Sequence, residues 1–239
     1  NIKLLGNKPL FLHILEKLLE IKLLDEVWID TDDIKIIKIA ENYGYNGFKY
    51  FIRNKELASN KTDGNKLLEN EINNINADIY IQVLCTSPFT KKNSIIKCIE
   101  LLKSRKEQSV VGCYFEKLYL WNNKGPIYDK NNIPNSNTLN DTIIESMSIY
   151  GITKDEFKKT KLRIGNKPYL LDLDIEERID INYQNDFNLA EKIAKFNNIK
   201  KNNLFNNLKL KLNSCILSDI LNEMGYNNCV LKNFKLNLN

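Results

Sequence analysis

Apolar runs alternate with helical stripes along most of this chain. Residues 77–84 form a run with almost no hydrophobic–polar alternation, which is typical of a strand buried on both faces of a mainly parallel sheet. The run stops at Cys85-Thr86-Ser87-Pro88, and a helical stripe follows at about residues 94–102. In open α/β sheets, ligands bind beyond the carboxyl ends of the strands, so this turn is the first place to look for chemistry.

The same alternation extends on both sides of this run. Strands are predicted at residues 26–30, 49–53, 109–115, 145–152 and 167–173, and helices at 8–24, 33–43, from about 66, 154–159 and 185–196. This order predicts an α/β fold with a right-handed, doubly wound, mainly parallel sheet. Between residues 117 and 140 the pattern weakens, and residues 122–126 are typical of a hairpin turn.

The last fifth of the chain has a different character. Residues 197–211 are polar and of low complexity, which predicts a linker. Residues 212–224 carry a new amphipathic stripe that ends at Gly225. Residues 212–239 are too few to bury a core of their own. We therefore expect a main domain at 1–196, a linker at 197–211 and the start of a truncated second domain at 212–239.

Composition narrows the class of protein. Hydrophobic residues make up 43% of the chain, which is enough for a sizeable core, and no apolar run approaches the length of a membrane span. The net charge of +5 comes from dispersed lysines, and no basic patch interleaved with aromatic residues indicates nucleic-acid binding. No signal peptide is visible, and the cysteines form no Cys-x-x-Cys pair. We expect a cytoplasmic protein with reduced core thiols that binds neither membranes nor nucleic acids.

Carboxylates at the ends of predicted strands are the main candidates for chemistry, since the chain has no glycine-rich phosphate loop and no His/Cys metal cluster. Residues 31–33 (Thr-Asp-Asp) are a good helix N-cap, and Asp30 and Asp32 fit the same structural interpretation. Asp180 and Asn182 are two residues apart in an extended segment, so both can point at one ligand. Such oxygen ligands suit magnesium that is bound together with substrate phosphates.

Two basic residues each allow a functional and a structural interpretation. Arg53 ends a predicted strand at the ligand edge, where its guanidinium can clamp phosphate oxygens. The alternative for Arg53 is an ion pair with Glu56 or Asp63. His13 is the only histidine, and it lies inside a predicted helix, where we interpret it as a partly buried helical residue rather than a catalyst.

Five segments resemble, in order and spacing, the acylneuraminate (CMP-sialic acid synthetase-type) cytidylyltransferases and the similar CMP-Kdo synthetases. They are residues 1–10 (NIKLLGNKPL), 29–33 (IDTDD), 53–59 (RNKELAS), 85–89 (CTSPF) and 179–191 (IDIN, then Asp186 and AE). The resemblance covers about residues 1–196. It implies a Rossmann-like fold of the nucleotide-diphospho-sugar transferase type with a small hairpin insertion for dimerisation. Relatives are often dimers through the region 117–164, so a homodimer is expected.

The resemblance also implies an activity. Relatives transfer the cytidylyl group of CTP to the anomeric hydroxyl of a 2-keto acid sugar, a nonulosonic acid such as an N-acylneuraminate, for surface polysaccharide or lipopolysaccharide, and release pyrophosphate with Mg²⁺. By position, Arg53 and Asp180 match catalytic residues, and Asp180 matches the first metal-binding aspartate, with Asn182 at the second. The matching nucleotide-binding positions are Asn1, Arg53, Ser59, Asn60, Asn65, Thr86 and Ser87. We expect Asp180, Arg53 and Thr86 to face one shared cleft.

Three departures from the family pattern bear on activity. The glycine-, arginine- and lysine-bearing nucleotide loop is expected just before Asn1, so the sequence as given is expected to be inactive alone. Asn182 replaces an aspartate and lowers the negative charge available to a metal ion. Leu84-Cys85 replaces Gln-Pro before the Thr-Ser-Pro turn, which removes a polar side chain near the sugar.

Other readings of the sequence stay open. Asn182 and Leu84 are also compatible with a non-catalytic relative that serves as a binding or assembly module, and a nucleotidyltransferase with a different nucleotide or sugar is a third hypothesis. Residues 212–225 (LNSCILSDILNEMG) resemble the opening helix of the regulator of ribonuclease activity A / hydroxy-oxoacid aldolase-like family. That resemblance implies a fusion whose second domain begins here.

Overall fold

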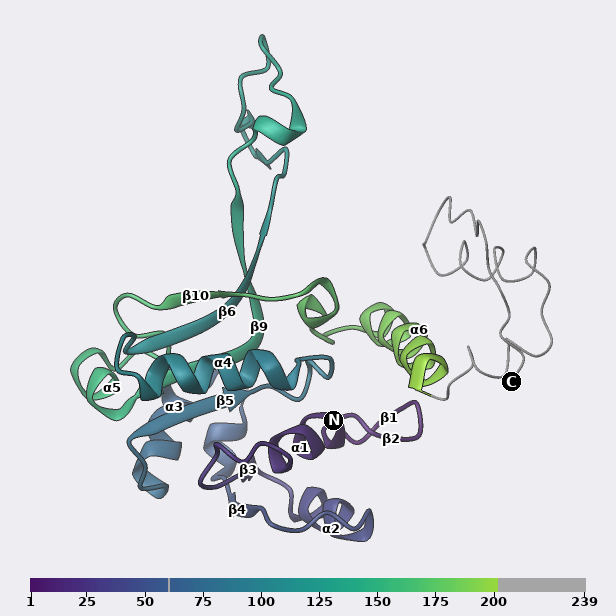
Figure 1. The fold of residues 1–239 in the computed structure, drawn as a ribbon, viewed down its shortest axis with the longest axis vertical. Helices are drawn as coiled ribbons and strands as arrows, with labels where there is room; N and C mark the ends of the chain where they lie inside the picture. The colour runs from purple at the N-terminus through teal and green to yellow at the C-terminus, as the bar shows by residue number, and fades with distance from the viewer. Residues whose placement is uncertain (60, 202–239) are drawn as a thin grey trace, which may run out of the picture. The chain divides into compact units, whose positions relative to one another are not determined.

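The computed structural model describes residues 1–59 and 61–201. The chain divides into two compact units, Asn1–Phe187 and Asn188–Asn239. The division falls within helix α6 (Gln184–Lys201), which also extends into the start of the segment expected to be a linker. The rest of that segment and the expected second domain lie outside the described residues. All the strands described below belong to the first unit (Figure 1).

The central sheet has four strands in the order β10-β6-β9-β5. Their bounds are β5 (Ile79–Val83), β6 (Ser109–Glu116), β9 (Thr142–Thr153) and β10 (Tyr169–Asp172). β10 runs parallel to β6, whereas β9 is antiparallel to both of its neighbours. The α/β class is confirmed, and the sheet is mixed because β9 returns from β6 through a hairpin rather than a crossover helix.

A second, two-stranded parallel sheet contains β3 (Trp28–Thr31) and β4 (Lys49–Ile52), which are joined by helix α2 (Ile34–Asn42). The Asp33 side chain caps α2 by accepting a hydrogen bond from the Lys35 amide at 2.9 Å, as the sequence predicts. In the described part of the chain, β3 pairs only with β4, and β5 pairs only with β9. β3 and β5 line the same cavity.

The first predicted helix is shorter than expected. A hairpin of β1 (Leu4–Leu5) and β2 (Lys8–Pro9) comes before helix α1 (Leu12–Leu19). Its turn includes Gly6, whose φ of +64° favours glycine. His13 lies in α1 with its Nε2 atom 2.9 Å from the Leu5 carbonyl oxygen, and burial lowers its pKa. This position agrees with the interpretation of His13 as a partly buried helical residue.

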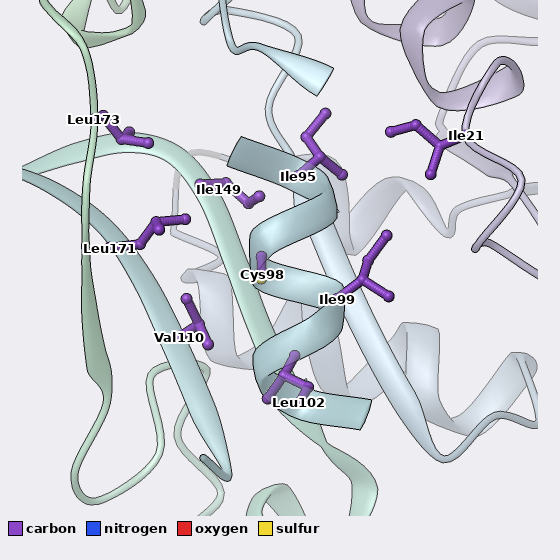
Figure 2. Close-up of a cluster of buried hydrophobic side chains, with 9 residues drawn as sticks. All are labelled: Ile21, Ile95, Cys98, Ile99, Leu102, Val110, Ile149, Leu171 and Leu173. Atoms are coloured by element: carbon purple, nitrogen blue, oxygen red, sulfur yellow. The ribbon is translucent and has the colours of Figure 1, made fainter. Parts of the chain in front are cut away.

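Helices cover both faces of the central sheet. Helix α4 (Lys92–Lys103) covers one face through Ile95, Cys98, Ile99 and Leu102, which pack against side chains that include Val110, Ile149 and Leu171 (Figure 2). On the other face, α3 (Gly64–Asn74) and α5 (Lys154–Thr160) place Leu68 and Phe157 against Tyr80 and Ile152. Successive residues of a strand point to opposite faces, so β5 is held from both sides and its carboxyl end is fixed.

β6 and β9 continue beyond the sheet as a two-stranded hairpin arm, residues 114–144 (Figure 1). Its outer part contains β7 (Trp121–Asn122), β8 (Gly125–Pro126) and the 3-10 turn Ser136–Thr138. The hairpin turn predicted at residues 122–126 is confirmed. Large apolar side chains are exposed on this arm, namely Leu118, Tyr119, Leu120, Trp121, Ile127, Ile133 and Ile143.

Candidate functional site

The turn after β5 is held in place from several elements. The Leu84 amide donates to the Ser148 carbonyl of β9 at 2.8 Å. The Lys17 ammonium from α1 donates to the carbonyl oxygens of Pro88 at 2.7 Å and Thr90 at 2.8 Å. These bonds hold the backbone on either side of Thr86, so the turn has a fixed position at the carboxyl end of β5.

Asp180 lies next to this turn because the Ile181 amide donates to the Thr86 carbonyl at 2.9 Å. One carboxylate oxygen of Asp180, Oδ2, accepts a hydrogen bond from the Asn182 side-chain amide at 2.7 Å. The other oxygen, Oδ1, is buried and has no hydrogen-bond partner. A buried carboxylate oxygen without a partner is costly, so this atom is suited to a cation that arrives with a ligand.

Asp186 has a different task from Asp180. Its Oδ2 atom accepts the amide hydrogens of Asn182 at 3.0 Å and Tyr183 at 2.7 Å, at the start of α6. This carboxylate therefore serves as a helix cap through its Oδ2 atom.

A magnesium ion fits this donor set only if the substrate completes it. Within residues 1–59 and 61–201, no group of three or more His, Cys, Asp or Glu side chains is arranged to hold a metal ion. Asp180 supplies one free carboxylate oxygen, and magnesium is commonly held by one or two carboxylates together with substrate phosphates and water. The site is thus incomplete without a phosphate-bearing ligand.

Arg53 forms an ion pair that differs from both partners expected from the sequence. Its Nε atom lies 3.0 Å from Asp30 Oδ1, and the two side chains are only 18% and 15% exposed. The predicted ion pair of Arg53 with Glu56 or Asp63 is wrong. β3 and β4 lie side by side, which brings Asp30 close to the end of β4. Burial raises the pKa of Asp30, and the charge of Arg53 opposes that rise.

Glu71 and Gln82 form a second polar pair that the sequence analysis missed. The Gln82 side-chain amide on β5 donates to both carboxylate oxygens of Glu71 on α3, at 2.8 and 2.9 Å. Burial raises the pKa of Glu71 to about 7, and the nearby charge of Asp30 also raises it. A signal for this pair exists in the sequence, since Gln82 interrupts an otherwise apolar run.

Because of this pKa, Glu71 is expected to make stability depend on pH. The folded state holds the Glu71 proton more tightly than the unfolded chain, so stability falls as pH rises from the ordinary value of 4.5 to about 7. Glu71→Gln removes this ionisation and is expected to raise the free energy of unfolding by about 1–3 kcal/mol at pH 8, with no gain below pH 4.5.

Urea unfolding at pH 4.5 and pH 8 measures this difference. Glu69→Gln is the matched control, because Glu69 lies on the same helix and makes an exposed pair with Lys161. An equal effect of the Glu71 substitution at both pH values would contradict the assigned titration.

The structure places Asp180 against the Thr86 turn at the carboxyl end of β5, and Arg53, which follows β4, lies near the same turn. Burial raises the pKa of Cys85, with Asp180 adding to the rise and Arg53 opposing it, so both charges act on the residue next to Thr86. Arg53, Cys85 and Thr86 also line one cavity. Arg53 and Thr86 therefore share a cavity, and Asp180 lies beside it through the bond from the Ile181 amide to Thr86, without lining the cavity itself.

The other expected nucleotide contacts vary in position. Asn1 lines the cavity. Ser87 is fully buried, and its hydroxyl donates to the Met147 carbonyl at 3.4 Å, which favours a structural role over a nucleotide contact. Ser59 is exposed, with its hydroxyl 3.3 Å from that of Thr62, and Asn65 accepts a bond from the Arg163 amide at 2.7 Å. Asn60 lies outside the described residues.

Comparisons with known proteins point to one family. A family model described as "Cytidylyltransferase" matches residues 1–209. The chain is 24% identical over 233 residues to the N-acylneuraminate cytidylyltransferase of Escherichia coli O18:K1:H7, covering 89% of this chain and 52% of the relative. It is 28% identical over 104 residues to the 3-deoxy-manno-octulosonate cytidylyltransferase of Thermodesulfovibrio yellowstonii, covering 43% of this chain and 41% of the relative.

The chain thus spans about half the length, or less, of these curated relatives. A solved structure of 4-diphosphocytidyl-2C-methyl-D-erythritol synthase from Anaerococcus prevotii is similar in fold, with a TM-score of 0.59 at 15% identity. The similarity covers 80% of this chain and 88% of that structure. Among the helices that the structure describes, none combines the length and apolar character needed to cross a membrane.

Proposed function

Because the chain belongs to the cytidylyltransferase family, we propose that it transfers the cytidylyl group of CTP to the anomeric hydroxyl of a 2-keto acid sugar. The bond from the α-phosphorus to the sugar oxygen forms as the bond to the pyrophosphate oxygen breaks, and the hydroxyl proton is lost to solvent. A nonulosonic acid such as an N-acylneuraminate is the proposed acceptor, in line with the name of one relative. The observation that supports the proposal is the position of Asp180 against the Thr86 turn at the end of β5, with Arg53 near that turn.

Phosphoryl-group chemistry of this kind needs positioning and charge more than covalent help from the protein. The rigid Thr86 turn offers a fixed surface against which a nucleotide can be placed, and Arg53 carries a charge held in the same cleft. Asp180, with its unpartnered Oδ1, would hold magnesium, and Asn182 would remain beside it as a neutral neighbour. When bound, magnesium would neutralise charge on the triphosphate and on the leaving pyrophosphate.

Pyrophosphate release by the native polypeptide tests the proposed function. The assay combines CTP, UTP or GTP with N-acetylneuraminate or 3-deoxy-manno-octulosonate in the presence of magnesium. Release only with CTP and a sugar acid supports the proposal, whereas release with UTP or GTP supports a different specificity. A non-catalytic relative would show no release and no nucleotide-dependent rise in melting temperature, although CTP at about 100 times its Kd should stabilise a binding protein by about 2.7 kcal/mol.

We also propose that the protein forms a homodimer through the hairpin arm. Trp121 is 67% exposed there and lies among other exposed apolar side chains, which marks an interaction surface. Trp121→Glu is expected to convert the dimer to a monomer, because a charge in an apolar interface is costly to bury. Light scattering after size-exclusion chromatography measures the mass. Tyr183→Glu is the control, since Tyr183 is 79% exposed and is not among the arm residues 114–144. A dimer that survives Trp121→Glu would count against this interface.

A further inference from the structure

Arg163 is an arginine whose orientation is fixed by its surroundings. It lies in the loop between α5 and β10, and its guanidinium carbon stacks 3.7 Å from the centre of the Tyr150 ring. Its backbone amide is tied to Asn65 at the start of α3. A side-chain carbon at Gly64 would meet the Arg163 Nη1 atom at 2.5 Å, so the guanidinium rests directly on the first turn of that helix.

The fork of this guanidinium has no carboxylate to bind among the described residues. Arginine–carboxylate ion pairs are formed there by Arg53 with Asp30 and by Arg178 with Glu116, and no acidic group lies within 4.0 Å of Arg163. The side chain is half-buried and lines the same cavity as Arg53 and Thr86. A partly desolvated arginine that is held in place without a counter-ion is suited to an anion supplied by a ligand.

Arg163 lies near two side chains that also feel the charges of Arg53 and Asp180. Its charge opposes the burial that raises the pKa values of Glu71 and Tyr150, so it lies near both side chains. The charge of Arg53 also acts on Glu71, and the charge of Asp180 also acts on Tyr150. An acceptor whose reacting hydroxyl lies near Asp180 can therefore present its carboxylate to Arg163.

We infer that Arg163 binds the carboxylate of the sugar acid and so selects acidic acceptors. This inference rests on the proposed function, which supplies an acceptor with a carboxylate attached to its reacting carbon. Tyr150 occupies one face of the guanidinium. The edge of the guanidinium carries N–H groups whose spacing matches the two oxygens of a carboxylate. The nucleotide phosphates are the other anion in the reaction, and they belong with Asp180 and Arg53.

Kinetics of Arg163→Lys and Arg163→Ala distinguish these two anions. We expect KM for N-acetylneuraminate or 3-deoxy-manno-octulosonate to rise about 10- to 100-fold, since a charge-assisted bidentate contact is lost, while KM for CTP changes by less than about twofold. Lysine should restore only part of the loss, because it lacks the planar fork. A rise confined to the KM for CTP would assign Arg163 to the phosphates and overturn the inference.

Gly64→Ala gives an independent test that keeps the arginine. The new methyl group would occupy the space of the Nη1 atom, and the flexible end of Arg163 must move to avoid it. The φ angle at Gly64 is not in the left-handed region, so alanine is tolerated by the backbone. We expect a rise in the acceptor KM in the same direction as for Arg163→Ala, with an unchanged melting temperature. A purely structural arginine would instead lower the melting temperature and leave the acceptor KM in place.

Calorimetry can measure how tightly the native polypeptide binds each sugar acid and the corresponding methyl ester. These affinities separate failure of the inference from failure of the proposed function. The expected result is that the unaltered protein binds the acid at least about 10-fold more tightly than the ester, and that Arg163→Ala removes the preference. A preference that persists in Arg163→Ala overturns the inference alone. If the unaltered protein binds neither acid, the proposed function and the inference both fail.

Discussion

Replacing Asp180 by asparagine is expected to abolish pyrophosphate release from CTP while leaving the protein folded. Asp180 offers the one carboxylate oxygen at the Thr86 turn that is buried and free of a hydrogen bond. An amide at this position keeps the shape but cannot neutralise a cation, so we expect the rate to fall at least about 1000-fold, equivalent to about 4 kcal/mol of transition-state stabilisation. Single-turnover assays with saturating CTP and magnesium measure the loss.

The stability of this variant provides a second readout. An ionised carboxylate with an unpartnered buried oxygen is unfavourable, so Asp180→Asn should melt at the same temperature as the unaltered protein or higher. The stabilisation that magnesium and CTP give together should be lost. Asp186→Asn is the matched control, because asparagine also caps helices well and Asp186 only accepts backbone amides. Equal turnover in Asp180→Asn and Asp186→Asn would remove the metal role from Asp180.

Arg53→Met is expected to reduce both turnover and stability. Loss of a fixed positive charge near the transferring phosphate should lower kcat by about 100- to 1000-fold. The substitution also leaves Asp30 half-buried without its ion-pair partner, which is expected to cost up to about 3–5 kcal/mol when Asp30 is ionised. The stability loss should shrink as the pH falls through the raised pKa of Asp30, which lies above its ordinary value of 3.8, because the protonated carboxyl needs no counter-ion.

Two further variants separate these effects. Asp30→Asn combined with Arg53→Met removes both charges, so it should recover much of the stability but none of the turnover. Arg105→Met is the control for the loss of an arginine, since Arg105 is exposed and forms no ion pair in the part of the chain that the structure describes. Turnover within a few-fold of normal in Arg53→Met would show that Arg53 is a structural ion-pair residue only.

Local patterns were sufficient where the physical cause is local. The capped start of α2 at Asp33, the hairpin turn at residues 122–126 and the buried run that became β5 each depend on residues close together in sequence. The α1 boundary was wrong, because the β1–β2 hairpin takes Pro9 into a pairing with Leu4 that no helical periodicity reveals. Pairing between strands decides such boundaries, and pairing is not a property of one segment.

The candidate site shows the same division. Motif resemblance singled out Asp180, Arg53 and Thr86, and the structure places Asp180 against the Thr86 turn with Arg53 near it. Three residues of the polar cavity wall escaped the sequence analysis, namely Glu71, Gln82 and Arg163. They come from a helix, a strand and a loop that are far apart in the chain, so only packing brings them together.

By itself, the sequence determined the α/β class and most of the helices and strands, because hydrophobic periodicity and capping residues act over a few positions. Only the tertiary structure decided that β9 runs antiparallel between β5 and β6, that Arg53 pairs with Asp30, and that Arg163 faces the cavity without a counter-ion. Those outcomes depend on which distant segments lie side by side, because spatial neighbours decide whether a charged side chain has an ion-pair partner.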